Sequence, residues 1–96
     1  MKKIQRRDKM KIYGDLLSVL QVESSNKKIV ITKIASKSNI PFTRLKKYIS
    51  DLKELGLIED EMTFKLTEKG KEYLDQYKTV LAFMKSMGMS YKDEQN

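Results

Sequence analysis

Residues 39–58 read NIPFTRLKKYISDLKELGLI, and this stretch decides the fold. Its apolar side chains recur every three or four positions, which places them on one stripe of an α-helix: Leu45, Ile49, Leu52 and Leu55. Polar and basic side chains occupy the opposite face: Thr43, Arg44, Lys46, Lys47 and Ser50. Pro41 suits the first turn of a helix because its φ is already helical, and Gly56 is the residue type that best ends one. The stretch therefore predicts a helix over residues 42–55 with one buried face and one basic face.

The preceding residues predict two more helices and a short strand. An apolar stripe indicates a helix from Asp8 to about Val22: Ile12, Tyr13, Leu16, Leu17, Val19 and Leu20. KIVIT, residues 28–32, is a β-branched run that predicts a short strand, and Thr32 would cap a helix over residues 33–39. We expect a tight turn over residues 39–41 to join that helix to the basic one.

After Gly56 the period of the apolar residues changes from helical spacing to alternation. The alternation predicts a hairpin with one buried face, made by Leu57 and Ile58 on one side of an acidic turn and by Met62, Phe64 and Leu66 on the other. Thr67 would then cap a long helix over residues 67–90. We expect one domain over residues 8–66, with a basic arm at residues 1–7 and a frayed tail at residues 91–96.

Composition favours a polyanionic partner. The chain has 96 residues with 20 Lys plus Arg against 13 Asp plus Glu, which gives a net charge of +7. Cys and His are absent, which removes thiolate and imidazole ligands, and neither a Gly-rich phosphate loop nor a G-x-S-x-G motif is present. We therefore expect no enzyme, no metal and no cofactor. Because no long apolar run occurs, we also expect a cytoplasmic protein that does not contact a membrane.

The predicted order of helix, strand, helix, turn, basic helix, hairpin and helix is that of a winged helix-turn-helix. Residues 31–75, ITKIASKSNIPFTRLKKYISDLKELGLIEDEMTFKLTEKGKEYLD, resemble small archaeal winged-helix proteins described as transcriptional regulators or dimeric chromatin proteins. The resemblance extends over about residues 8–87, and LTEKGKEYL is among its most specific parts. It implies a mainly α (α+β) fold, nucleoid-associated binding to double-stranded DNA without a cofactor, and a homodimer joined by an antiparallel coiled coil of the last helix.

The candidate DNA-binding residues lie on the basic helix and on the loop and helix before it. They are Thr43, Arg44, Lys46, Lys47, Ser50, Lys27, Lys28, Lys33 and Lys37. Taken alone, a Lys-rich face is what any solvated amphipathic helix carries, and the basic arm is either a disordered tail or an element that follows the DNA backbone. The acidic turn of Glu59, Asp60 and Glu61 would be repelled by phosphate, so we expect a hairpin with a purely structural role.

The last helix predicts a dimer interface. Tyr73, Tyr77, Val80, Met84, Met87 and Tyr91 follow the four-three alternation of a coiled coil. The candidate dimerisation residues are Tyr73, Tyr77, Val80, Leu81, Met84 and Met87. Gly88 interrupts the pattern, and a monomer that folds this helix back on itself stays open. A protein-interaction adaptor on the same scaffold is the alternative function, RNA binding is a weaker one, and no small-molecule ligand is predicted.

Overall fold

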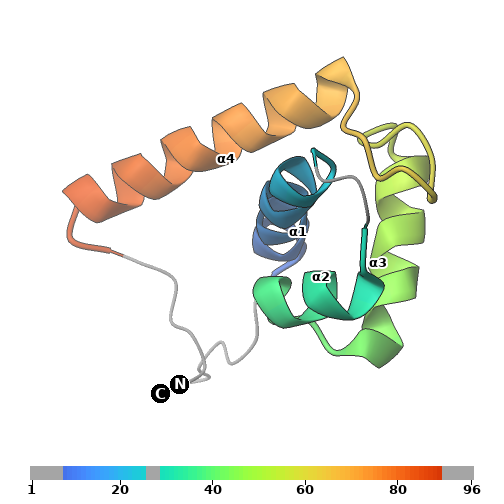
Figure 1. Cartoon of the computed structure of the whole chain (residues 1–96). Coiled ribbons are helices and arrows are strands. Elements are labelled where there is room, and N and C mark those ends of the chain that lie inside the picture. Colours follow the sequence, from blue (N-terminus) through green and yellow to red (C-terminus); the bar gives the residue numbers. More distant parts are fainter. Residues whose placement is uncertain (1–7, 26–28, 90–96) are drawn as a thin grey trace.

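The computed structural model describes residues 8–25 and 29–89, so the predicted basic arm, the predicted tail, Lys27 and Lys28 lie outside the described residues. The described chain forms four helices: α1 (Lys9–Glu23), α2 (Ile31–Ser38), α3 (Phe42–Glu54) and α4 (Glu68–Ser86). In Figure 1, α1 lies at the centre, α2 and α3 lie on one side of it, and α4 crosses past them and extends away from the body. The molecule is elongated, with principal extents of 42 × 27 × 23 Å.

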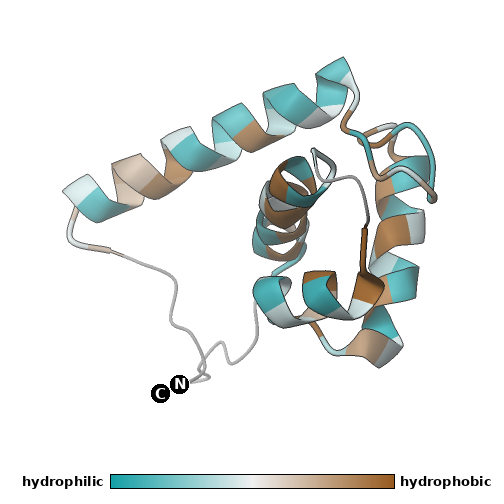
Figure 2. Ribbon diagram, in the orientation of Figure 1, coloured by the Kyte–Doolittle hydropathy of each residue, from teal (hydrophilic) through white to brown (hydrophobic). Residues whose placement is uncertain are grey.

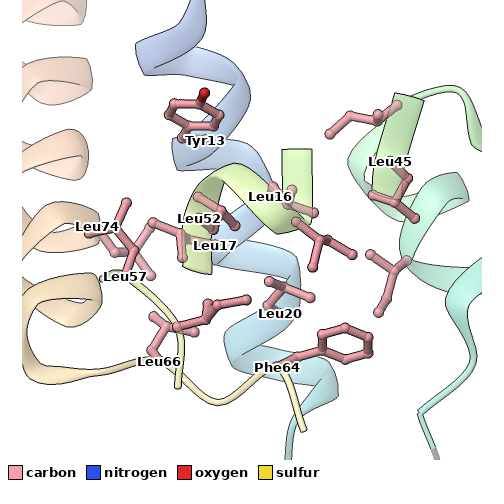
Figure 3. Close-up of a cluster of buried hydrophobic side chains, with 14 of the residues drawn as sticks. Tyr13, Leu16, Leu17, Leu20, Leu45, Leu52, Leu57, Phe64, Leu66 and Leu74 are labelled. Atoms are coloured by element: carbon pink, nitrogen blue, oxygen red, sulfur yellow. The ribbon is translucent and has the colours of Figure 1, made fainter. Parts of the chain in front are cut away.

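The core is built around α1. Leu16, Leu17 and Leu20 have no exposed surface, and each such buried side chain stabilises the fold by about 1.5–3 kcal/mol. Figure 3 shows them between Leu45 of α3 on one side and Leu74 of α4 on the other. The apolar stripe predicted for α1 is therefore the face on which the other helices pack.

Side-chain caps begin α1 and α4 close to the predicted positions. The Asp8 carboxylate accepts a hydrogen bond from the Lys11 backbone N–H at 2.9 Å. The Thr67 hydroxyl accepts one from the Gly70 N–H at 3.0 Å. The predicted Thr67 cap is confirmed, and α1 differs from its predicted bounds by about one residue at each end.

The predicted strand over residues 28–32 is wrong. Ile31 and Thr32 belong to α2, whose N-cap is Val30, so the predicted Thr32 cap is also wrong. Val30 is extended, and neither Ile29 nor Val30 has a strand partner in the described part of the chain. The β-branched residues have no second strand with which to form hydrogen bonds. The burial of Ile34 and Ala35 in the core favours a helix over the β-strand propensity of these residues.

The predicted hairpin is reduced to a loop. Between residues 57 and 67 of the described chain, the ladder is one isolated antiparallel bridge between Ile58 and Leu66. The Asp60 carboxylate accepts hydrogen bonds from the backbone N–H groups of Met62, at 2.6 Å, and Thr63, at 2.8 Å. The backbone N–H groups that would form ladder hydrogen bonds in a strand are thus bonded to a side chain. Met62 is not part of the predicted buried face, and 82% of its surface is exposed.

The turns on either side of α3 have left-handed residues at the positions that end the preceding helix. Asn39 has φ 59° and ends α2, and the Ile40 N–H then bonds the Ala35 carbonyl at 3.1 Å. Gly56 has φ 78° and follows α3, and the Leu57 N–H bonds the Leu52 carbonyl at 2.8 Å. The predicted turn at residues 39–41 and the predicted end of the basic helix at Gly56 are confirmed.

Two glycines let the N-terminal half of α4 approach the body closely. A Cβ at Gly14 would overlap the ring of Tyr77, and one at Gly70 would overlap the backbone carbonyl of Leu57. Lys69 donates from its ammonium group to the Leu55 carbonyl at 2.8 Å, which ties the start of α4 to the end of α3. The helix ends at Ser86, before the predicted residue 90, because the chain turns at Gly88, which has φ 76°.

Candidate nucleic-acid interface

The basic face of α3 lies at the surface, as the periodicity predicts. Leu45, Ile49 and Leu52 have at most 3% of their surface exposed and hold the opposite face against the core. The outward side chains of the first turns are exposed: Thr43, Arg44, Lys46 and Lys47. Ser50 is half-buried. Leu55, predicted to lie on the buried stripe, is instead the C-cap of α3, and 45% of its surface is exposed. The geometry brings Thr43, Arg44, Lys46 and Lys47 together on one accessible surface.

The positive charges of this surface are largely uncompensated by the protein itself. In the described ranges, neither Arg44 nor Lys46 forms an ion pair with a carboxylate. Lys47 lies 3.8 Å from Asp51, but its side chain is 71% exposed, so the pairing is weak. The surface is therefore positioned to attract an anion from solution.

Asp51 also fixes α3 to α1 through a tyrosine. The Tyr13 hydroxyl donates to the Asp51 carboxylate at 2.9 Å, and the ring of Tyr13 meets Tyr48 edge-on at 6.3 Å. Burial, reinforced by the hydrogen bond to Asp51 and by its negative charge, raises the pKa of Tyr13 to about 12. Tyr13 therefore remains a neutral donor across the physiological range and holds the orientation of α3.

A hollow of about 330 Å³ lies where the start of α1 meets the start of α3. Arg44 and Lys9 both line it, together with Pro41 and Tyr48. Lys9 is exposed; sequence reasoning included it only in the basic N-terminal cluster of residues 2–9 and did not place it beside α3. The available signal was its position directly after the Asp8 cap, which fixes it at the first turn of α1.

The two described lysines of α2 are not placed like those of α3. The Lys37 ammonium lies 2.9 Å from one carboxylate oxygen of Glu23, and the Lys33 ammonium lies 4.0 Å from the other. Glu23, the last residue of α1, has a side chain that is only 2% exposed. This pairing could not be predicted from sequence, because Glu23 and Lys37 lie 14 residues apart along the chain and on different helices.

The acidic turn that follows α3 is held by hydrogen bonds among its own residues. Hydrogen bonds from the Thr63 and Met62 backbones hold the pKa of Asp60 below its ordinary value. Glu59 and Glu61 are exposed. The turn therefore presents negative charge to solvent.

The predicted dimerisation residues divide between two faces of α4. Tyr77 is 4% exposed, packs on Gly14 and donates a hydrogen bond to Asp15 at 2.9 Å, so it belongs to the core of its own chain. Leu81 packs against the same core. Tyr73 is half-buried and donates to the Met10 carbonyl at 2.9 Å. Val80 and Met84 are half-buried, whereas Met87 is 59% exposed.

A second stripe of α4 starts at the edge of the body and continues past it. Tyr73, Gln76 and Val80 line a largely apolar groove of about 310 Å³ beside Met10. The same helical spacing continues to Phe83, which is 60% exposed, and to Met87. Figure 2 shows apolar residues along α4 as far as its C-terminal end, beyond the packed body. Sequence reasoning missed Phe83 because the stripe was placed one residue along, at Tyr77 and Met84.

The comparison with protein families agrees with this arrangement of helices. The sequence model of the winged helix-turn-helix family matches residues 6–92. The chain therefore belongs to the winged helix-turn-helix family, a class of domain that typically binds DNA and is not enzymatic. Searches of curated proteins and of solved structures gave no match. Within residues 8–25 and 29–89, no helix is long and apolar enough to cross a membrane.

Proposed function

We propose that the protein binds duplex DNA through α3, which enters the major groove with its N-terminal turns. The observation that carries the proposal is the exposed group of Arg44, Lys46 and Lys47 on the helix that follows the turn, with the opposite face of that helix fully buried. Lys46 and Lys47 would contact phosphates, and Thr43 and Arg44 would reach base edges or flanking phosphates. Such a protein acts on the nucleoid as a transcriptional regulator or as an architectural protein.

The charge pattern supports the N-terminal half of α3 as the part that meets DNA. Its basic residues lie in the first turns, whereas Asp51 and Glu54 lie in the last ones. The two carboxylates would be repelled by phosphates if the C-terminal half entered the groove first. Lys9, at the rim of the hollow beside Arg44, would add a backbone contact on the same side.

The salt dependence of binding tests this function. If each protomer neutralises about five phosphates, the logarithm of the affinity should fall with the logarithm of the salt concentration at a slope of about −4 to −5 per protomer. A fluorescence titration of a labelled duplex at several ionic strengths measures the slope. A flat response would contradict DNA binding, and an equal or stronger affinity for single-stranded RNA would contradict the duplex as the partner.

We also propose that the protein is a homodimer joined by α4. The support is the second stripe of Tyr73, Gln76, Val80, Phe83 and Met87, whose spacing suits packing of two helices and whose last two apolar residues are exposed. Its C-terminal part projects beyond the body, where apolar side chains meet water unless another surface covers them. Two copies would carry two copies of α3 and would thereby raise the avidity for DNA.

An interaction adaptor is the second candidate function. Met62, 82% exposed beside the acidic residues Glu59 and Glu61, favours it, because an exposed apolar tip with a charged rim suits a protein partner. The two functions differ in which substitutions matter. An adaptor would keep its activity when Arg44 and Lys47 are replaced by Ala and would lose it with Met62→Asp.

A further inference from the structure

Glu23 is the one buried acidic side chain of the described residues, and it faces the lysines of α2. The Glu23 side chain is 2% exposed, whereas the side chains of Lys33 and Lys37 are 52% and 48% exposed. One carboxylate oxygen lies 2.9 Å from the Lys37 ammonium and the other 4.0 Å from the Lys33 ammonium. Lys33 and Lys37 are one turn apart on α2, so both reach the same carboxylate.

Burial makes this pairing harder to exchange than a surface ion pair. A carboxylate removed from water and left without a cation is strongly unfavourable, because the low-dielectric interior neither solvates it nor screens it. A phosphate of DNA, in contrast, can keep its mobile counterions when a lysine does not reach it. Moving Lys33 and Lys37 to phosphates would weaken the pairing of the buried Glu23 carboxylate, so contacts with Glu23 compete with contacts to DNA.

We infer that Glu23 is an internal counter-ion that withholds Lys33 and Lys37 from the DNA backbone and thereby limits how many phosphates the protein neutralises. The inference rests on the proposed DNA binding. It assigns the electrostatic contact to α3, where Arg44 and Lys46 have no carboxylate partner in the described part of the chain. Glu23 is a positioning residue, since it acts through the lysines and does not itself touch the DNA.

Neutralising Glu23 tests the inference. Glu23→Gln should release the lysines, tighten duplex binding about three- to tenfold near 0.1 M salt, and steepen the logarithmic salt slope by about one for each lysine that reaches a phosphate. Asp75→Asn is the matched control, because it removes one exposed negative charge from α4, far along the chain from α2. We expect the control to leave the salt slope unchanged. A purely structural role for Glu23 would not steepen the slope of a folded variant.

A second substitution identifies the source of the gain. Lys37→Ala should change the salt slope little in the wild-type background and should remove much of the gain in the Glu23→Gln background. A Glu23→Gln variant that keeps the wild-type slope would overturn the inference, and so would a gain that survives replacement of both lysines by Ala. Circular dichroism melting of each variant confirms that the compared proteins are folded.

A measurement on the unaltered protein covers the case in which Glu23→Gln does not fold. In side-chain NMR spectra, the Nζ signals of Lys46 and Lys47 should shift on addition of duplex DNA, while those of Lys33 and Lys37 should stay in place. Equal shifts for all four lysines would overturn the inference and leave DNA binding intact. No shift at any lysine, together with no binding, would instead refute the proposed function.

Discussion

At the scale of single residues, Tyr13 connects the central helix to the helix proposed to bind DNA. Its hydroxyl donates to Asp51, and its pKa is raised to about 12 from an ordinary value of 10.0. A raised pKa means that the folded protein retains this proton more strongly than the unfolded chain does. The resulting stability is fully present below pH 10 and is lost as the pH rises toward 12. The position of α3 thus depends on a tyrosine that stays protonated.

We predict that the free energy of unfolding of the wild type falls between pH 10 and pH 12 by about 2–3 kcal/mol more than that of Tyr13→Phe. The comparison is needed because lysines titrate in the same range and contribute equally to both proteins. Denaturant unfolding at a series of pH values measures the difference. Identical pH profiles for the two proteins would show that the Tyr13 proton is not linked to folding.

Gly14 sets how closely α4 can lie on α1, because any Cβ there would overlap the Tyr77 ring. Ala normally stabilises a helix interior by about 1 kcal/mol relative to Gly. We predict the opposite here: Gly14→Ala should lower the free energy of unfolding by about 1–3 kcal/mol through overpacking. In a Tyr77→Ala background, where the ring is gone, the same substitution should be neutral or stabilising. Thermal or urea unfolding measures both, and a stabilised Gly14→Ala single variant would refute this close contact.

At the scale of elements, α4 has two apolar faces with different tasks. Leu74, Tyr77 and Leu81 face the body, whereas Val80, Phe83 and Met87 lie on the second stripe, where Phe83 and Met87 are exposed. We predict that Phe83→Asp combined with Met87→Asp turns a dimer into a folded monomer, because two carboxylates would be buried at the interface. Sedimentation velocity measures the change.

The matched control for this interface is Ala82→Asp. Ala82 is exposed on the polar stripe of α4 that also carries Asp75, Lys78 and Lys85, so an added charge there meets solvent. We expect this variant to keep the wild-type oligomeric state. A wild type that sediments as a monomer at every concentration would contradict the proposed dimer.

The helices could be predicted from sequence because their signals are local. The apolar stripe of α1, the turn at Asn39 and the cap at Thr67 each depend on a few neighbouring residues. The strand over residues 28–32 and the hairpin failed because a strand needs a partner, and no single stretch of sequence shows whether one exists. Hydrogen bonds to the Asp60 carboxylate take the place of the expected hairpin ladder. From the sequence alone, Asp60 is only one of three acidic residues of a turn.

The candidate site divides in the same way. The accessibility of Arg44 and Lys47 follows from helix periodicity, whereas the pairing of Lys37 with Glu23 depends on how α2 lies against α1. The coiled-coil spacing of α4 is equally ambiguous, because a stripe that docks on its own chain and one that meets a second chain have the same period. Tyr77 proved to face its own chain.

At the scale of the whole molecule, the basic residues of α3 and the exposed apolar residues of α4 lie in different parts of the protein. The basic turns of α3 lie on the packed body, while the apolar end of α4 projects away from it (Figure 1). A net charge of +7 gives the chain a general attraction to polyanions, so weak DNA binding alone would not identify the surface that makes the contact. Only a comparison of variants with the same total charge separates a specific surface from this background.

The most direct test replaces two basic residues of α3 and compares them with two of α4. Arg44→Ala with Lys47→Ala and the control Lys78→Ala with Lys85→Ala remove equal charge from exposed positions. In duplex titrations near 0.1 M salt, we predict that the α3 variant binds at least about tenfold more weakly than the wild type. Repeating the titrations at several salt concentrations should give a logarithmic salt slope that is shallower by about two. The α4 variant should stay close to the wild type. Equal losses in the two variants, or an undiminished affinity of the α3 variant, would contradict the proposal that α3 is the DNA-binding surface.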